Sequence, residues 1–272
     1  MENYTFSNFA TAALVFIGFA QFAFLFIQHR HNQIVLIEEF RKQFITTKYN
    51  LGVLVFLGRS PNEYYQILPK NEINKLKVLL SKSKMSSPTI WALDSAKSFF
   101  PFFSGVCLKI LQGQLNIQDI YPLFGTELLR HSLPLKRLLE NTRDENFTVS
   151  KKHMNIRSEI QAWLVYHEGI RRRSLIMLDL LWAEASRLED LPPSDLISAA
   201  DKKLETGRIN RVRIFEEARR INRPLIPFKE YLLLDFLRHS EYRKFFFLKG
   251  LDRNRLALLD DVWTENLLKK YK

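Results

Sequence analysis

The chain is poor in the residues that build several common classes of protein. Its 272 residues include a single cysteine, Cys107, which excludes an internal disulfide framework and any cysteine-based zinc cluster. Nine glycines and ten prolines are too few for collagen, for flexible linkers or for a turn-rich all-β fold. Because 46% of the residues are hydrophobic and 26% are charged, the composition also differs from that of a disordered chain.

Familiar motifs for phosphate binding and catalysis are missing as well. The sequence contains no P-loop, no GxGxxG turn and no GxSxG nucleophile elbow, and its six histidines are too scattered for a zincin helix. It indicates no cofactor and no metal site. These absences weigh against an enzyme without deciding the question, because active sites also assemble from distant residues.

One polar cluster suggests chemistry. His167, next to Glu168, is a candidate general base, and the arginines that follow, Arg171, Arg172 and Arg173, are candidate phosphate ligands. The alternative is a solvated helix junction in which the basic residues offset acidic neighbours. We favour the junction, and we assign no catalytic residue.

A long uncharged segment at the N-terminus is the strongest signal. The 22 residues from Phe6 to Ile27 carry no formal charge, and about 20 apolar helical residues cross a bilayer core. A cleaved signal peptide normally has a positive n-region, but residues 1–7 contain no Lys or Arg. A buried core helix would be unusually apolar on every face. We therefore expect an uncleaved transmembrane anchor at residues 1–28, with its span at about 6–27.

Basic residues flank only one end of this span. Glu2 precedes it, whereas Arg30, Arg41, Lys42 and Lys48 follow it. Since cytoplasmic flanks are enriched in Lys and Arg, the N-terminus should lie outside and the remainder in the cytoplasm. The expected location is the cell (inner) membrane, crossed once.

The span also carries a stripe of small and polar residues. At 100° per residue, Ser7 falls on one face with a set of candidate association residues: Ala10, Thr11, Gly18 and Gln21. Small residues let two helices approach closely, and a buried glutamine can form a hydrogen bond across the contact. Leu14 interrupts the stripe, and small residues are common in spans, so a homo-oligomer formed through this face is one of two alternatives.

The remainder of the chain predicts an all-α fold. Residues 29–48 have the pattern of an amphipathic stalk helix, and residues 49–272 that of a basic α-helical domain. Residues 50–58 are either a buried strand or, as the flanking helical patterns favour, part of a helix. Residues 89–113 are either a membrane-dipping segment or, as we favour, a buried hairpin of two short helices broken at Pro101.

Further helices follow from apolar spacing and from Pro and Gly punctuation. Pro134 is expected to divide one helical pair, Pro192-Pro193 to stop a helix, and Ser194-Asp195 to cap a short one. The expected helices cover residues 71–80, the pair 121–140, and 157–167, 170–191, 209–221, 228–248 and 254–271, with a loop at 143–150.

The net charge of +12 suggests an anionic partner. Five arginines between residues 202 and 223 fall within about 140° of helical arc, interrupted by Ile209 and Val212: Arg208, Arg213, Arg219, Arg220 and Arg223. This face either binds phosphates of nucleic acid or of anionic lipid headgroups, or it is merely solvated. In the solvated alternative, Glu216 and Glu217 pair with Arg219 and Arg220.

The sequence as a whole therefore predicts a single-pass, membrane-anchored helical scaffold or effector. It would self-associate and present a basic cytoplasmic domain to a partner, which is an anionic lipid surface, a nucleic acid or another protein. The alternative is a membrane-tethered protein or enzyme that binds nucleic acid or nucleotides through its arginine clusters.

Overall fold

The computed structural model describes residues 2–59, 74, 86–140, 151–188 and 190–222, together with residues 258, 261, 262 and 265. Every regular element in these residues is an α-helix, and no strand occurs among them, which confirms the all-α prediction. The expected helices at 71–80, 228–248 and 254–271 and the loop at 143–150 lie outside the described residues, apart from isolated positions.

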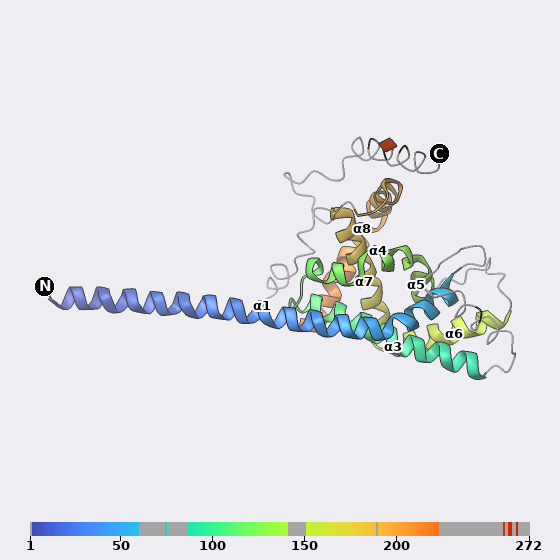
Figure 1. The fold of residues 1–272 in the computed structure, drawn as a ribbon, viewed down its shortest axis with the longest axis horizontal. Coiled ribbons are helices and arrows are strands. Elements are labelled where there is room, and N and C mark those ends of the chain that lie inside the picture. The colour runs from blue at the N-terminus through green and yellow to red at the C-terminus, as the bar shows by residue number, and fades with distance from the viewer. Residues whose placement is uncertain are drawn as a thin grey trace. The chain divides into compact units, whose positions relative to one another are not determined.

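Helix α1 runs without interruption from Glu2 to Gly58 (Figure 1). Residues 50–58, for which the sequence left a strand or a helix open, are its last turns, so the helical interpretation is confirmed. By internal contacts the chain divides into two compact units, residues 1–42 and residues 43–272, and α1 contributes to both.

The first unit contains an apolar segment whose side chains face away from protein. Of the described helices, α1 alone is long and apolar enough to cross a membrane, and none of its most apolar window is buried. The large side chains of residues 14–27 are exposed around the whole circumference of the helix; Phe16 is 75% and Phe19 73% exposed.

The second unit is organised around α7 (Ile170–Leu188), which packs against α3, α4, α5, α6 and α8 (Figure 1). Its side chains are buried on nearly every face between Ser174 and Ser186. Helices that are hydrophobic all round occupy the centre of a domain. The sequence predicts the helix but places its end three residues later, at Leu191.

Helix α3 (Ser86–Leu111) supplies the aromatic part of the core. Phe99 stacks on Phe103 with ring centroids 5.4 Å apart, and Phe103 meets Phe124 of α4 edge-on at 5.5 Å. Phe44, from the second-unit part of α1, lies 5.0 Å from Phe124 in another edge-on contact. Most apolar side chains between residues 92 and 111 are thus buried in the core, which favours the core interpretation over a membrane-dipping segment.

The two-helix hairpin expected in this segment is wrong, because α3 continues through Pro101. Proline removes one backbone hydrogen bond and usually kinks a helix. Here the aromatic residues on both sides, Phe99, Phe100, Phe102 and Phe103, are all buried. Their burial contributes several times the free energy of one backbone hydrogen bond, so the continuous helix is retained.

Helices α4 (Ile117–Arg130) and α5 (Ser132–Leu139) form the predicted pair, but the break lies at His131 and not at Pro134. Pro134 is the third residue of α5, where a backbone N–H has no intrahelical acceptor and proline costs little. Within α4, Gly125 has a φ of 58°, and the helix kinks there.

Helix α6 (Lys151–Tyr166) is followed after a short turn by α7, and α8 runs from Pro193 to Asn222. The sequence predicted a short helix near Ser194 and a separate one at 209–221; α8 is instead one helix of 30 residues. Pro193 stands at its first position, where a fixed φ favours helix initiation. Between the two expected helices the chain contains no proline and only one glycine, Gly207. A single glycine inside a helix lowers helix stability by only about 1 kcal/mol.

Candidate functional site

The arginine cluster predicted from the sequence lies in the first turn of α7. Gly169 joins α6 to α7 with a φ of +77°, a left-handed conformation that glycine adopts without strain. A side chain at this position would also collide with the guanidinium of Arg173. The turn therefore holds the Arg173 side chain close to the backbone of Gly169.

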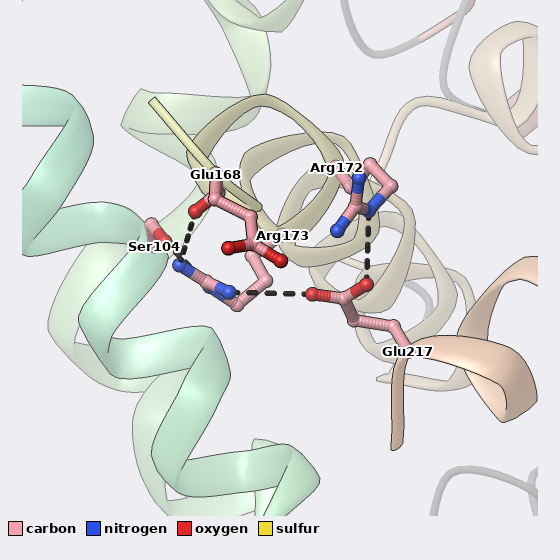
Figure 2. Close-up of polar contacts among 5 residues, drawn as sticks. All are labelled: Ser104, Glu168, Arg172, Arg173 and Glu217. Atoms are coloured by element: carbon pink, nitrogen blue, oxygen red, sulfur yellow. Dashed lines mark hydrogen bonds and ion pairs between the residues drawn. The ribbon is translucent and has the colours of Figure 1, made fainter. Parts of the chain in front are cut away.

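Arg173 and its neighbour Arg172 converge on one carboxylate of α8 (Figure 2). Arg172 Nε donates to Glu217 Oε2 at 2.9 Å, and Arg173 Nη1 donates to Glu217 Oε1 at 3.3 Å. Arg173 Nε also donates to Ser104 Oγ of α3 at 2.8 Å, and its Nη2 donates to the Glu168 backbone oxygen at 3.3 Å. Glu217 is 3% exposed. We call Ser104, Arg172, Arg173 and Glu217 the arginine–glutamate cluster.

This cluster ties three helices together. Ser104 belongs to α3, the two arginines to α7 and Glu217 to α8. A second polar contact joins the C-terminal ends of α3 and α8, because Asn222 Nδ2 donates to the Leu111 backbone oxygen at 2.9 Å. A buried carboxylate needs paired charge and hydrogen bonds, and the two arginines supply both.

The geometry of the cluster suits a structural connection better than catalysis. Ser104 Oγ accepts from Arg173 and has no neighbouring base in the contacts described. Cys107, three residues after Ser104 on α3, is completely buried, and burial raises the pKa of its thiol far above the usual range. A thiol of this kind is protonated at neutral pH, and the protonated form is a poor nucleophile.

The other predicted residues of this region are engaged separately. Arg171 Nε donates to the Leu139 backbone oxygen of α5. His167 is exposed; its Nδ1 donates to the Trp163 backbone oxygen at 2.8 Å, and its ring lies 4.3 Å from the Trp163 ring. In that tautomer Nε2 is an acceptor facing water, and no described contact joins His167 to the arginine–glutamate cluster.

The structure divides the five arginines of the predicted α8 face. Arg219 and Arg220 are exposed, and no ion pair to either is found among the described residues. Arg213 is half-buried. Arg208 lies in α8 but its side chain is not among those described, and Arg223 lies outside the described residues.

The pairing expected for Glu217 is wrong. The solvated alternative paired it with Arg220, three residues further along α8, whereas the structure pairs it with Arg172 and Arg173 of α7. The physical reason is the helical phase: Glu217 lies between the buried side chains of Ile214 and Ala218, on the inner face of α8. Arg219 and Arg220 point to the outer face.

Two half-buried ionisable groups were not predicted from the sequence. Asp179 lies in the middle of α7, and burial raises its pKa to about 6, against the opposing effect of Lys136 and Arg213. Arg157 of α6 donates to the backbone oxygens of Leu57 and Arg59 at 2.6 and 2.8 Å. It thereby satisfies carbonyl groups at the C-terminal end of α1, where a positive charge is favourable.

Among the residues whose contacts were not predicted, only Glu217 could have been recognised as buried from the sequence. The spacing that places Ile214 and Ala218 on the inner face also places Glu217 there, so its burial follows from the helical phase. Ser104, Asp179 and Arg157 have ordinary helical neighbours, and their contacts depend on how distant helices pack.

The residues of the predicted association stripe lie on the N-terminal part of α1. Gly18 and Gln21 are exposed, and a Cβ built on Gly18 meets no atom within 4 Å. Thr11 is also exposed, and the side chain of Ala10 is not among those described. Gly18 and Gln21 thus lie on a surface that the described part of the first unit leaves open.

In the described ranges no group of three or more His, Cys, Asp or Glu side chains is placed to hold a metal ion. Comparison with protein-family models, with curated proteins and with solved structures found no match to this chain.

Proposed function

We propose that this protein is a single-pass, membrane-anchored helical scaffold or effector, with its N-terminus outside and its helical domain in the cytoplasm. The observation that carries the proposal is the exposure of the apolar side chains of residues 14–27 on all sides of α1. Exposed apolar surface of this extent is unfavourable in water and marks a membrane or protein contact. A bilayer covers every face of a helix at once, whereas a protein partner covers one.

The charges next to the segment support the orientation. Arg30, Arg41, Lys42 and Lys48 all follow it, and Arg30 donates to Gln33 and Arg41 to Glu38 within the same helix. These contacts leave the basic groups on the C-terminal side of the span, the side that faces the cytoplasm in most membrane proteins. The proposed location is accordingly the inner membrane, with the second unit inside the cell.

The anchoring is tested by alkaline carbonate extraction of membranes from cells that express the full chain. We expect the chain to stay in the pellet, and a chain in which Leu14, Phe19 and Phe22 are all changed to Arg to leave it, because each central arginine costs about 2.5–3.5 kcal/mol. A reporter fused after Lys272 should be active only in the cytoplasm. Complete release of the unaltered chain by carbonate, or activity of the reporter outside the cytoplasm, would refute this proposal.

Self-association through the stripe is the second part of the proposal. Its support is the open space at Gly18 together with the exposed Gln21 amide, which has no hydrogen-bond partner in the described part of the chain. Gly18→Leu fits the single helix without a collision, so a loss of crosslinked oligomers would locate the contact at this face. Ala23→Leu, on the opposite face, is the matched control and should leave the oligomers unchanged.

The nucleic-acid alternative now depends on fewer residues. Arg171, Arg172 and Arg173 are engaged inside the second unit, which favours a structural role for all three. Any phosphate contact would therefore involve the outer face of α8, where Arg219 and Arg220 are exposed. Presentation of this basic face to a partner is the role that we propose for the second unit.

A further inference from the structure

The outer face of α8 combines exposed arginines with exposed apolar residues. Ile209 is 61% and Val212 49% exposed, and Arg219 and Arg220 are exposed about two to three turns further along. At 100° per residue, Ile209, Val212, Glu216, Arg219 and Arg220 fall within about 100° of arc. We call these five residues the outer α8 face.

The orientation of this face is fixed by the opposite side of the helix. Ile214 and Ala218 are completely buried, and Glu217 is held by both arginines of the arginine–glutamate cluster. Asn222 adds a hydrogen bond to the end of α3. A helix held in this way cannot rotate to hide Ile209 and Val212 without breaking an ion pair with a buried carboxylate, so their exposure is built into the packing.

We propose that the outer α8 face docks on the anionic headgroup surface of the bilayer in which the chain is anchored. Arg219 and Arg220 would bind lipid phosphates, and Ile209 and Val212 would enter the boundary between headgroups and acyl chains. This inference rests on the membrane anchoring proposed above and names the partner of the second unit.

The apolar residues distinguish a lipid surface from a nucleic acid. Interfacial helices combine arginine or lysine with apolar side chains that enter the acyl boundary, and both kinds of residue then contribute to binding. Nucleic-acid phosphates would engage Arg219 and Arg220 but would leave Ile209 and Val212 in water. Nonspecific binding of single strands also uses aromatic side chains for stacking, and the outer α8 face contains none.

The tether raises the effective concentration of headgroups at the second unit. Only residues 28–42 separate the proposed span from the second unit, a length of about 22 Å as a helix. A domain tethered at this distance meets headgroups at a high effective concentration, so a modest intrinsic affinity is sufficient. Two arginines outnumber Glu216 on this face, which gives it the sign that anionic lipids attract.

The test uses the full chain in lipid nanodiscs, with an environment-sensitive fluorophore on Val212→Cys. Cys107 is completely buried, so the introduced thiol is the one that labels readily. The matched control position is Val165→Cys on α6, which is likewise exposed. Nanodiscs contain either phosphatidylcholine alone or equal parts of phosphatidylcholine and phosphatidylglycerol, with spin-labelled lipid as the quencher of the fluorophore.

We expect the fluorophore at residue 212 to shift to the blue and to be quenched by spin-labelled lipid in the anionic discs, and much less in the neutral ones. The control at residue 165 should respond to neither. Equal signals at 212 in both kinds of disc, or no quenching in either, would overturn the proposal. Should Val212→Cys fold poorly by circular dichroism, Ile209→Cys provides the same measurement from the same face.

Charge reversal sharpens the test. Arg219→Glu with Arg220→Glu should lower the ratio of docked to free domain by at least about fivefold per arginine, and the quenching at residue 212 should fall accordingly. Lys97→Glu with Arg130→Glu makes the same change of net charge at exposed positions of α3 and α4 and should leave the quenching unchanged. Equal effects of both pairs would show a general charge effect and would refute the assignment to this face.

A failure of anchoring is distinguishable from a failure of docking, because a chain that does not enter nanodiscs at all refutes the membrane anchor itself. With the chain in neutral discs, added single-stranded RNA should not change the fluorescence at residue 212. An RNA response at 212 without a response to anionic lipid would assign the face to nucleic acid and overturn the proposal.

Discussion

Two apolar, phenylalanine-rich helical segments of this chain have opposite environments. Residues 14–27 of α1 expose their phenylalanines, whereas Phe99, Phe100 and Phe103 of α3 are at most 1% exposed. Their compositions are similar, but α3 carries Lys97 and Lys109 on either side of its phenylalanines, and α1 has no charge between Phe6 and Ile27. Uninterrupted apolar length, and not aromatic content, therefore separates a helix suited to lipid from a helix suited to a protein core.

A second difference lies in the faces of the two segments. Helix α3 has its aromatic contacts on the side of α4 and α1, and Ser104 on the side of α7 and α8. The segment in α1 is exposed on every side within its unit. A bilayer makes no demand for specific packing partners, whereas a core requires them. Mutations that truncate a side chain should therefore distinguish the two segments.

The largest expected effect is the loss of stability when a buried phenylalanine of α3 is truncated, compared with an exposed phenylalanine of α1. Phe103→Ala should lower the free energy of unfolding of the second unit by about 3–5 kcal/mol, because it opens a cavity among Phe99, Phe124 and their neighbours. Phe19→Ala should change it by less than about 0.5 kcal/mol. Urea unfolding of the full chain in detergent, followed by tryptophan fluorescence, measures both. Equal losses would contradict the division into core and lipid-facing segments.

The arginine–glutamate cluster offers a comparison between an inner and an outer carboxylate of α8. Glu217→Gln should destabilise the second unit by about 2–3 kcal/mol. This is below the loss for a fully buried pair, because the Arg172 side chain is 42% exposed and remains hydrated. Glu216→Gln, one residue away but exposed, should have an effect near zero.

Both glutamate variants are measured by the same unfolding experiment at neutral pH. Loss of Glu217 should also increase protease sensitivity within α8, because its contact with α7 is weakened. A Glu217→Gln chain as stable as the Glu216→Gln chain would show that the two arginines do not hold α8 in place.

Because of Asp179, we expect the free energy of unfolding of the second unit to depend on pH. Its pKa is raised from 3.8 to about 6, mainly by burial, so the folded chain keeps this proton to higher pH than the unfolded chain does. Stability should therefore fall as the pH rises from about 4 to about 6, by at most about 3 kcal/mol from this group, and remain lower above pH 6.

The matched pair for this pH dependence is Asp179→Asn and Asp94→Asn. Asp179→Asn should remove the fall in stability between pH 4 and 6 and should raise stability at pH 7. Asp94 is exposed, and its replacement should leave the pH profile as it is in the unaltered chain. Urea unfolding at a series of pH values measures the slope, and an unchanged slope in Asp179→Asn would assign it to other groups.

The smallest expected effect concerns two glycines. Gly169→Ala should cost about 1–2 kcal/mol, because alanine is strained at a φ of +77° and its Cβ would displace the guanidinium of Arg173. Gly105, in the middle of α3, has open space around its Cα. Gly105→Ala should therefore be neutral or stabilise the chain by up to about 1 kcal/mol. Similar effects at both positions would argue against a special role for the turn before α7.

The sequence was sufficient for elements whose apolar spacing is long and regular. The helix class, the boundaries of α7 within three residues and the inner face of α8 at Ile214 and Ala218 all follow from spacing. It was insufficient where packing overrides a local preference. The hydrogen bond lost at Pro101 is outweighed by burial of the neighbouring phenylalanines, and rules based on local sequence do not include this burial.

The polar contacts were harder to predict than the helices. Arg172 and Arg173 lie 45 and 44 residues from Glu217 in sequence, and spacing within one helix cannot reveal such a pair. Short-range rules instead suggested Arg220, three residues further along α8, as the partner of Glu217. The prediction failed because the buried position of Glu217 made its long-range partners more favourable than exposed neighbours.

Thiol accessibility in intact membranes measures whether the N-terminal part of α1 lies in lipid, as proposed. Phe19→Cys lies in the proposed span, and Ile45→Cys is a similarly exposed position of the same helix beyond it. In inverted inner-membrane vesicles, a membrane-impermeant maleimide should label residue 45 readily and residue 19 only after detergent is added. Labelling of residue 19 as fast as residue 45 in intact vesicles would contradict the account.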